Sequence, residues 1–327
     1  MLVPLNNKQS ALNGLIRQFY KGSHNIKLEV KDVNELTWSH QEEFIKETVN
    51  NYLTKKYPIS NEFIKAFIKK LIGYLELVQD VHDDLYKYLC MTMKNTTIES
   101  YYHHYLIGNN VMNRIIIRET NNLVLNGTTG MRTWEAALML VDWALCNKEV
   151  FRNKYVLELG SGVGFTGVAI AKFCPLDTIL MSDFHYDVLN MAEQNINVNF
   201  PCSQSQTTTY AKMFTTAETK VNIGVMNLDW TDISDLSEEL CPDIIIGADI
   251  VYDPTILKPL CEVFEWFFKK NKNIVIIIAG IIRNEDTFEQ FSRMIETNFQ
   301  VEYIQYDKNV FIEWNQDIKK YLLKIKL

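Results

Sequence analysis

The sequence predicts an α/β fold: a doubly wound, mostly parallel sheet with an antiparallel hairpin at one edge, preceded by a helical N-terminal domain. From residue 154 onward, short apolar runs alternate with helical stretches, which indicates a parallel sheet with helices on both faces. Before residue 110, apolar residues instead recur three and four positions apart, as on the buried side of a helix. A glycine-rich turn between a strand and a helix is typical of folds that bind a nucleotide-like ligand.

Length and composition predict a globular protein of one large or two unequal domains, and the change of pattern after residue 110 favours two. The chain has 327 residues, of which 47% are apolar and 22% charged, so it can bury a sizeable core. We expect one domain over 1–110 and a second over 111–327. Residues 1–110 carry 13 Lys and Arg against 12 Asp and Glu, and the remainder carry 20 against 28. The second domain is therefore acidic, which disfavours direct contact with nucleic acid and suits a cationic partner.

Cysteine usage and hydropathy predict a cytoplasmic protein. The six cysteines form no C-x-x-C pair, which fits reduced thiols better than a disulfide or zinc framework. Adjacent His103 and His104 point in different directions on any regular element, so no metal site is expected. The first twenty residues lack the features of a secretory signal, and the longest apolar run covers only 274–282, against about 20 residues for a membrane span. We expect a monomer that does not enter a membrane.

The N-terminal elements follow from apolar stripes at helical spacing. Phe63, Phe67 and Leu71 form one such stripe. Pro58 ends one helix and Ser60 can cap the next one. The predicted helices span 11–20, 41–57, 62–71 and 81–90, and a strand over 114–119 opens the second domain.

The second domain continues with five apolar runs that predict buried strands, separated by amphipathic runs that predict helices. The last two strand-like segments have no long helix between them, so we expect them to pair as an antiparallel hairpin at the sheet edge. The polar, aperiodic stretch 201–220 predicts a mobile surface loop. The expected strands are YVLEL, TILMS, NIGVMNL, DIIIGA and NIVIIIAG, then 299–305 and 318–325; the expected helices start at 163, 186, 256 and 285.

The glycine-rich turn, LELGSGVGFTG, carries the strongest local signal. Its glycines permit positive φ and close approach of a ligand to the backbone. A dinucleotide fingerprint, G-x-G-x-x-G, can be placed on Gly162, Gly164 and Gly167, so spacing alone does not exclude NAD. That placement leaves Glu158 unexplained, because a carboxylate repels a pyrophosphate but attracts a cationic, sulfonium-bearing amino acid. Asp183, after the next strand, suits the ribose hydroxyls of either cofactor or a simple helix N-cap.

Four motifs together resemble one enzyme family. They are E-x-G-x-G-x-G from Glu158, TTGMRTWEAALML over 128–140, LDW over 228–230 and GADIVYDP over 247–254. The chain resembles the class I, seven-strand protein-lysine methyltransferases that carry a D-x-x-Y signature, here Asp249 to Tyr252. The size and texture of the helical extension resemble the members that modify a lysine of translation elongation factor 2. The resemblance implies a Rossmann-like fold, S-adenosylmethionine as cofactor, and an N-terminal domain that recognises a protein substrate.

The resemblance also implies which residues bind the cofactor. The glycine-rich turn would lie under the methionine part, Asp183 would bind the ribose, and the backbone of Ala248 would meet the adenosyl group. Trp230 would pack near the adenine, where an indole adds about 0.5 to 1.5 kcal/mol beyond burial; for each tryptophan, core packing is the simpler alternative. The implied cofactor-binding residues are Trp134, Glu158, Gly160, Ser161, Gly162, Asp183, Trp230 and Ala248.

Asp249 and Tyr252 are the implied catalytic residues, because they follow a strand's carboxyl end beside the transferable methyl. A lysine with a pKa of about 10.4 must lose its proton before it can attack. The hypothesis is that both side chains orient the ammonium and help its proton leave. Alternatively, Asp249 caps a turn before Pro254 and Tyr252 only packs. A methyltransferase for another protein or a small molecule, an NAD-dependent oxidoreductase and a non-catalytic binding module remain as alternative functions.

Overall fold

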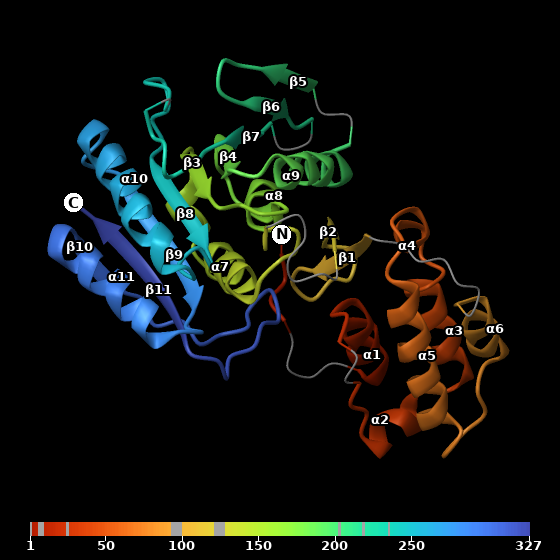
Figure 1. The fold of residues 1–327 in the computed structure, drawn as a ribbon. Coiled ribbons are helices and arrows are strands. Elements are labelled where there is room, and N and C mark those ends of the chain that lie inside the picture. Colours follow the sequence, from red (N-terminus) through yellow and green to blue (C-terminus); the bar gives the residue numbers. More distant parts are fainter. Residues whose placement is uncertain are drawn as a thin grey trace. The chain divides into compact units, whose positions relative to one another are not determined.

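A computed structural model describes residues 2–5, 10–23, 26–92, 100–120, 128–201, 204–217, 220–234 and 236–327. The chain divides into two compact units, Met1–Asn121 and Asn122–Leu327 (Figure 1). The division lies beyond residue 110 because the strand β2 (Arg114–Glu119) pairs antiparallel with β1 (Tyr101–Leu106). This hairpin belongs to the first unit, whereas the sequence placed its second strand in the second domain.

The first unit is built from short helices around an aromatic core. Phe19, Phe44 and Phe67 are fully buried and contact one another with ring centroids 5.2 to 6.0 Å apart. The helix predicted over 41–57 is instead two helices, because Thr48 leaves helical geometry and the Asn51 side chain caps a new helix by accepting the Leu53 N–H. The helices are α1 (Ala11–Tyr20), α2 (Val30–Glu35), α3 (Trp38–Glu47), α4 (Tyr52–Lys56), α5 (Asn61–Leu75) and α6 (Asp83–Thr92).

The second unit contains a nine-stranded sheet in the order β10-β11-β9-β8-β3-β4-β7-β6-β5. The five central strands are parallel, as the alternating sequence predicted. They are β3 (Tyr155–Leu159), β4 (Thr178–Asp183), β7 (Asn222–Asn227), β8 (Ile244–Ala248) and β9 (Val275–Ile281). The helices are α7 (Glu135–Cys146), α8 (Phe165–Phe173), α9 (Tyr186–Asn199), α10 (Leu257–Lys270) and α11 (Glu285–Asn298), with short 3₁₀ turns at Lys148–Phe151 and Pro254–Ile256.

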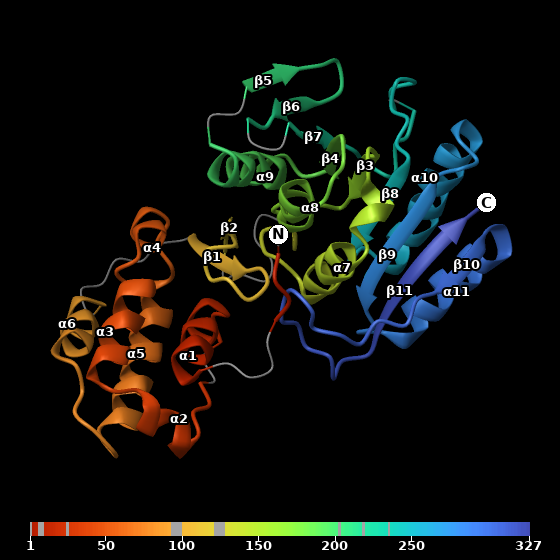
Figure 2. The same ribbon diagram turned by 180° about the vertical axis from the view of Figure 1, so that it is seen from behind.

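Antiparallel strands close both edges of the sheet, as the two opposite views show (Figures 1 and 2). The predicted C-terminal hairpin is confirmed: β10 (Gln300–Tyr303) pairs with β11 (Lys320–Lys326), which pairs with β9. The loop predicted over 201–220 is wrong, because β5 (Gln204–Thr207) and β6 (Lys212–Thr215) form a second hairpin beside β7. Every residue of β5 is exposed, so the strand lacks the apolar alternation that would reveal it in the sequence.

Strand order places a ligand crevice above β3 and β8. From β3 the chain moves outward to β4 and β7, then returns to β8 on the other side of β3. Such a reversal leaves a crevice at the carboxyl ends of the two adjacent strands. Leu157 and Leu159 pack in the core under α10 and α11, so Glu158 between them points to the opposite face. Among the described residues, no helix combines the length and apolar character that crossing a bilayer requires.

Candidate active site

A cavity of about 310 Å³ lies at the carboxyl ends of β3, β4 and β8. It is where the strand order places a crevice. The structure brings together every site residue that the sequence indicated, although they come from separate motifs. Trp134, Glu158, Gly160, Ser161, Gly162, Asp183, Trp230, Ala248, Asp249 and Tyr252 all line it.

The glycine turn after β3 adopts a conformation that other residues resist. Gly160, Gly162 and Gly164 have φ of +61°, +53° and +85°, in the left-handed region that favours glycine. A Cβ on Gly162 would lie 2.9 Å from the carbonyl oxygen of Gly130, and one on Gly160 would lie 2.8 Å from the Ile250 side chain. The turn is therefore packed closely against Gly130 and Ile250, which also line the cavity.

Glu158 brings an unsatisfied carboxylate to this pocket. The residue is 2% exposed, and its Oε2 has no hydrogen-bond partner among the described residues. Burial raises the pKa of Glu158 to about 8, against the opposing effects of the Thr166 hydroxyl and the Gly167 N–H. A buried acceptor without a donor costs about 1 to 3 kcal/mol. A cationic amino group in the cavity would favour the charged carboxylate.

Asp183 locks the glycine turn to the end of β4. Its carboxylate accepts the N–H of Gly162 at 3.2 Å and the N–H of His185 at 3.0 Å. Burial raises its pKa, which these two hydrogen bonds oppose. Asp183 is not the N-cap of α9, since His185 holds that position without a side-chain cap. The Ser161 N–H donates to the carbonyl of Ser182 at 2.8 Å, which ties the turn to β4 a second time.

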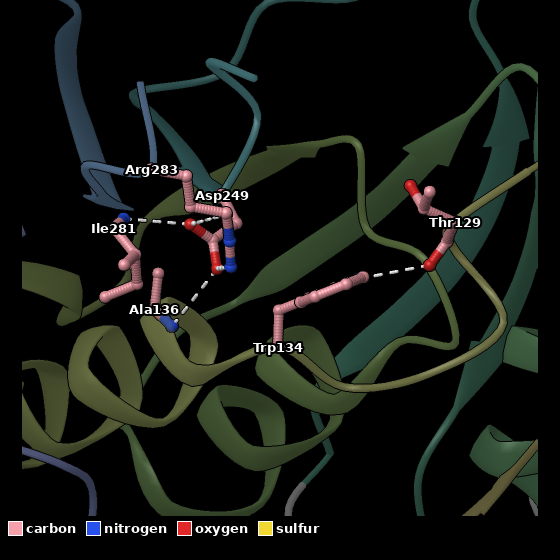
Figure 3. A network of polar contacts seen from close by, with 6 residues as sticks. All are labelled: Thr129, Trp134, Ala136, Asp249, Ile281 and Arg283. Atoms are coloured by element: carbon pink, nitrogen blue, oxygen red, sulfur yellow. Dashed lines mark hydrogen bonds and ion pairs between the residues drawn. The ribbon is translucent and has the colours of Figure 1, made fainter. Parts of the chain in front are cut away.

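Two tryptophans form walls of the cavity. Trp134 precedes α7, and its Nε1 donates to the Thr129 carbonyl at 3.1 Å (Figure 3). The Trp230 ring lies 3.5 Å from the point where a Cβ on Gly160 would stand. Both indoles therefore line the cavity, and Trp230 also packs against the core. Ala248 is the last residue of β8 and adds only a methyl group to the cavity.

The sequence led us to expect that Asp249 orients the ammonium of a substrate lysine, but in the structure its carboxylate is bound by other groups of the protein. Its side chain is 4% exposed and pairs with Arg283 through both oxygens, at 3.2 and 3.1 Å. The same carboxylate accepts the N–H of Ile281 at 2.9 Å and the N–H of Ala136 at 3.4 Å (Figure 3). Four donors thus hold it against the start of α7 and the end of β9.

The turn-capping alternative for Asp249 also fails, because Asp253 rather than Asp249 accepts the Thr255 N–H there. Tyr252 is different: it lines the cavity and is 52% exposed. Partial burial raises its pKa, which a hydrogen bond to the Thr129 side chain opposes. Of the D-x-x-Y pair, the tyrosine is therefore the side chain that an incoming group can reach.

Sequence reasoning missed the two arginines that flank Trp134. Arg132 lines the cavity with its guanidinium 5.1 Å from the ring centre, and Arg283 lies 4.9 Å from it. Arg283 follows β9 at the same carboxyl edge as the predicted residues. Ligands of open α/β sheets bind at the carboxyl ends of the strands, and the same principle applied to β9 would have indicated Arg283.

The four motifs lie in one cavity of a doubly wound sheet, and the same region matches a family model. A model described as lysine methyltransferase matches residues 114–298. The chain belongs to this lysine methyltransferase family. The match covers more than half of the chain and takes in every residue that lines the cavity. The oxidoreductase alternative is therefore set aside.

Similar proteins agree with this assignment. The methyltransferase is 30% identical to the human "Protein-lysine N-methyltransferase EEF2KMT" over 256 residues, which cover 76% of this chain and 74% of the human one. It is 31% identical to the "Protein-lysine N-methyltransferase EFM3" of Chaetomium thermophilum over 199 residues, or 59% of this chain and 54% of that one. The chain is thus a protein-lysine methyltransferase that uses S-adenosylmethionine.

The residues of the cavity fit this cofactor. The sulfonium of S-adenosylmethionine supplies the electrophilic methyl group. Glu158 places a buried carboxylate in the lining of the cavity, where it suits a cationic amino group, and Gly160 and Gly162 add no side chain to the same wall. A pyrophosphate would instead bring negative charge toward Glu158 and Asp183.

Proposed function

We propose that the methyltransferase transfers methyl groups to a lysine of translation elongation factor 2. The observation that carries the proposal is the extent of the human match. It covers 76% of the chain, about 249 residues, which is more than the 214 residues from Arg114 to Leu327. The similarity therefore reaches into the N-terminal unit, beyond the cofactor-binding region that the whole family model covers. A shared recognition unit supports a shared substrate.

The cofactor positions follow from the cavity. We assign the methionine part to the turn of Gly160, Ser161 and Gly162, with its amino group at Glu158. Asp183 faces the ribose hydroxyls and Trp230 packs on the adenine, beside the backbone of Ala248. Trp134 closes the wall opposite the turn.

Tyr252 is proposed to receive the lysine at the rim. A lysine with its ordinary pKa of about 10.4 must give up a proton, at a cost of about 4 kcal/mol near neutral pH. The Tyr252 hydroxyl orients the amine, and the proton leaves to water at this exposed rim. The N–C bond then forms as the C–S bond breaks, and alignment of the three atoms supplies most of the acceleration. Asp249 contributes indirectly, because its carboxylate holds the backbone at Ala136 and Ile281 in place beside the cavity.

The N-terminal unit is proposed to recognise the folded substrate. Leu77 and Tyr52 of this unit expose 79% and 72% of their surface, so both side chains are available for contact with a protein partner. Leu77→Ser should raise the KM for the protein substrate and leave affinity for S-adenosylhomocysteine unchanged. Val3→Ser, at an exposed position in the same unit, is the control. An unchanged KM in both variants would remove this role from Leu77.

A labelling experiment tests the substrate. The protein is incubated with methyl-labelled cofactor and a lysate that lacks the activity, and labelled bands are identified by mass spectrometry. A dominant band at elongation factor 2, absent with Tyr252→Phe, supports the proposal. Label in another protein or in small molecules refutes the named substrate. A cytoplasmic location is part of the proposal and fits the five described cysteines, which are all free thiols; fractionation of tagged protein tests it.

A further inference from the structure

Arg283 joins two residues of the pocket wall, Asp249 and Trp134, that no sequence motif connects. It lies two residues beyond β9, and its two terminal nitrogens meet the two Asp249 oxygens at 3.2 and 3.1 Å. This is the two-pronged geometry that a planar guanidinium forms with a carboxylate. The Asp249 side chain is 4% exposed, so Arg283 neutralises a charge that the pocket wall would otherwise bury unpaired.

The same guanidinium lies over the indole of Trp134, 4.9 Å from the ring centre (Figure 3). Trp134 is fixed at its other side by the hydrogen bond from Nε1 to Thr129. Because the indole face is electron-rich, the cation holds the ring in one orientation. Arg283 is thus a second support for a cavity wall, although it does not itself line the cavity.

Asp249 needs such support because its backbone is strained. Its φ is +56°, a left-handed value that is unfavourable for a non-glycine residue. The Asp249 N–H donates to the Ala279 carbonyl at 2.9 Å, and the side chain has the four donors described above. This bend brings Ile250 against the glycine turn, within 2.8 Å of a Cβ built on Gly160, and takes Tyr252 to the cavity.

We infer that Arg283 is a positioning residue for methyl transfer, which holds Trp134 and the turn from Asp249 to Tyr252 in one geometry around the cofactor. The inference rests on the proposed placement of cofactor and lysine. It also gives Asp249 a role that the D-x-x-Y signature alone does not reveal: the carboxylate binds the Arg283 guanidinium rather than the substrate amine. A lysine at 283 would keep the charge but lose the planar fork and most of the stacking.

Affinity for S-adenosylhomocysteine, measured by calorimetry on the full chain, tests the inference without any protein substrate. Arg283→Met should weaken binding about tenfold, and Arg283→Lys should restore only part of it, because one point charge replaces two directed bonds. Arg293→Met is the matched control, since Arg293 is 77% exposed and pairs only with Glu289 on its own helix; it should bind as wild type.

A double-mutant cycle with Asp249→Asn separates positioning from general loss of structure. If the two residues act as one unit, Arg283→Met with Asp249→Asn should bind the ligand within about threefold of Asp249→Asn alone. Circular dichroism and thermal unfolding confirm that each variant is folded at the assay temperature. Where a methylation assay is available, kcat should fall about 10²-fold for Arg283→Met, the cost of a misplaced reacting group, with little change in the KM for protein.

Two results would overturn the inference: wild-type ligand affinity in Arg283→Met, or additive effects of the two substitutions. Failure of the proposed function looks different. If elongation factor 2 is not the substrate, labelling in the lysate moves to another protein while the ligand affinities of the Arg283 variants still fall. If the cavity does not bind the cofactor at all, the wild-type protein itself gives no heat.

Discussion

Ligand binding at Glu158 should release a proton, because burial raises the pKa of this carboxyl. Burial raises the pKa of Glu158 to about 8 from an ordinary 4.5, so at pH 7 only about a tenth of the free protein carries the carboxylate. The amino group of the cofactor favours the charged form. Binding at pH 7 should therefore release about 0.9 proton, and affinity should be about tenfold below its plateau, or about 1.4 kcal/mol.

Calorimetry with S-adenosylhomocysteine measures both quantities. The apparent enthalpy in buffers of different ionisation enthalpy gives the number of protons released, and titrations between pH 6 and pH 9 give the affinity. We expect affinity to rise with pH through about 8 and then level off. Glu158→Gln should bind more weakly at pH 8 and show neither proton release nor the slope.

The folding stability of the free protein should depend on pH in the opposite direction to the ligand affinity. The native protein holds the Glu158 proton more tightly than the unfolded chain, so stability without ligand is greatest below pH 4.5 as far as this group is concerned, and falls as pH rises toward 8. Glu158→Gln should thus unfold at a higher temperature than wild type at pH 8 and lose that advantage near pH 5. Proton release near zero at pH 7, or an affinity independent of pH, would show that Glu158 does not meet the ligand's cation.

Three further predictions concern other parts of the unit. Tyr252→Phe should lower kcat about 10- to 100-fold in the methylation assay while calorimetric affinity for S-adenosylhomocysteine stays within twofold, because the hydroxyl serves the amine; equal activity would return Tyr252 to a packing role. Gly162→Ala should destabilise the protein by about 2 kcal/mol in urea titrations and weaken ligand binding, because φ is +53° and the Gly130 oxygen would lie 2.9 Å from the new methyl. Wild-type stability and wild-type affinity would contradict a required glycine at this position. Asp142→Asn should lower the free energy of unfolding by about 3 kcal/mol or more. The Asp142 oxygens accept three backbone N–H groups of 310–312 and the Tyr306 hydroxyl, and an amide nitrogen would face some of these donors. Thermal unfolding measures the change, and an unchanged melting temperature would show that these hydrogen bonds do not stabilise the fold.

The sequence allowed prediction of the parallel core because buried strands and helices leave a period in the apolar residues. Leu157 and Leu159, for example, alternate with the functional Glu158 in a short run between turn residues. The β5 and β6 hairpin was missed for the opposite reason: strands at an exposed edge have no buried face to encode. The boundary at 110 depended on where β2 pairs, and strand pairing across a hairpin is not visible in composition.

The candidate residues were found because each stands in a recognisable motif, and most of these motifs follow a strand end, but their tasks depend on partners distant in sequence. Asp249 has an obvious position in D-x-x-Y, yet the ion pair with Arg283 lies 34 positions away. Nothing local to either residue predicts that contact. A motif can therefore place a carboxylate at the site without revealing which cation it faces.

The two strands at the crevice end in the same unusual way. β3 and β8 are neighbours whose last paired residues are Leu159 and Gly247. Each strand is followed by a left-handed residue: Gly160 with φ of +61° and Asp249 with φ of +56°. Both bends turn the chain away from the sheet and leave the crevice open. The first bend requires a glycine, because a Cβ on residue 160 would collide with Ile250. The other is an aspartate, whose carboxylate accepts hydrogen bonds from Arg283 and from the N–H groups of Ala136 and Ile281. These contacts offset the strain of its backbone.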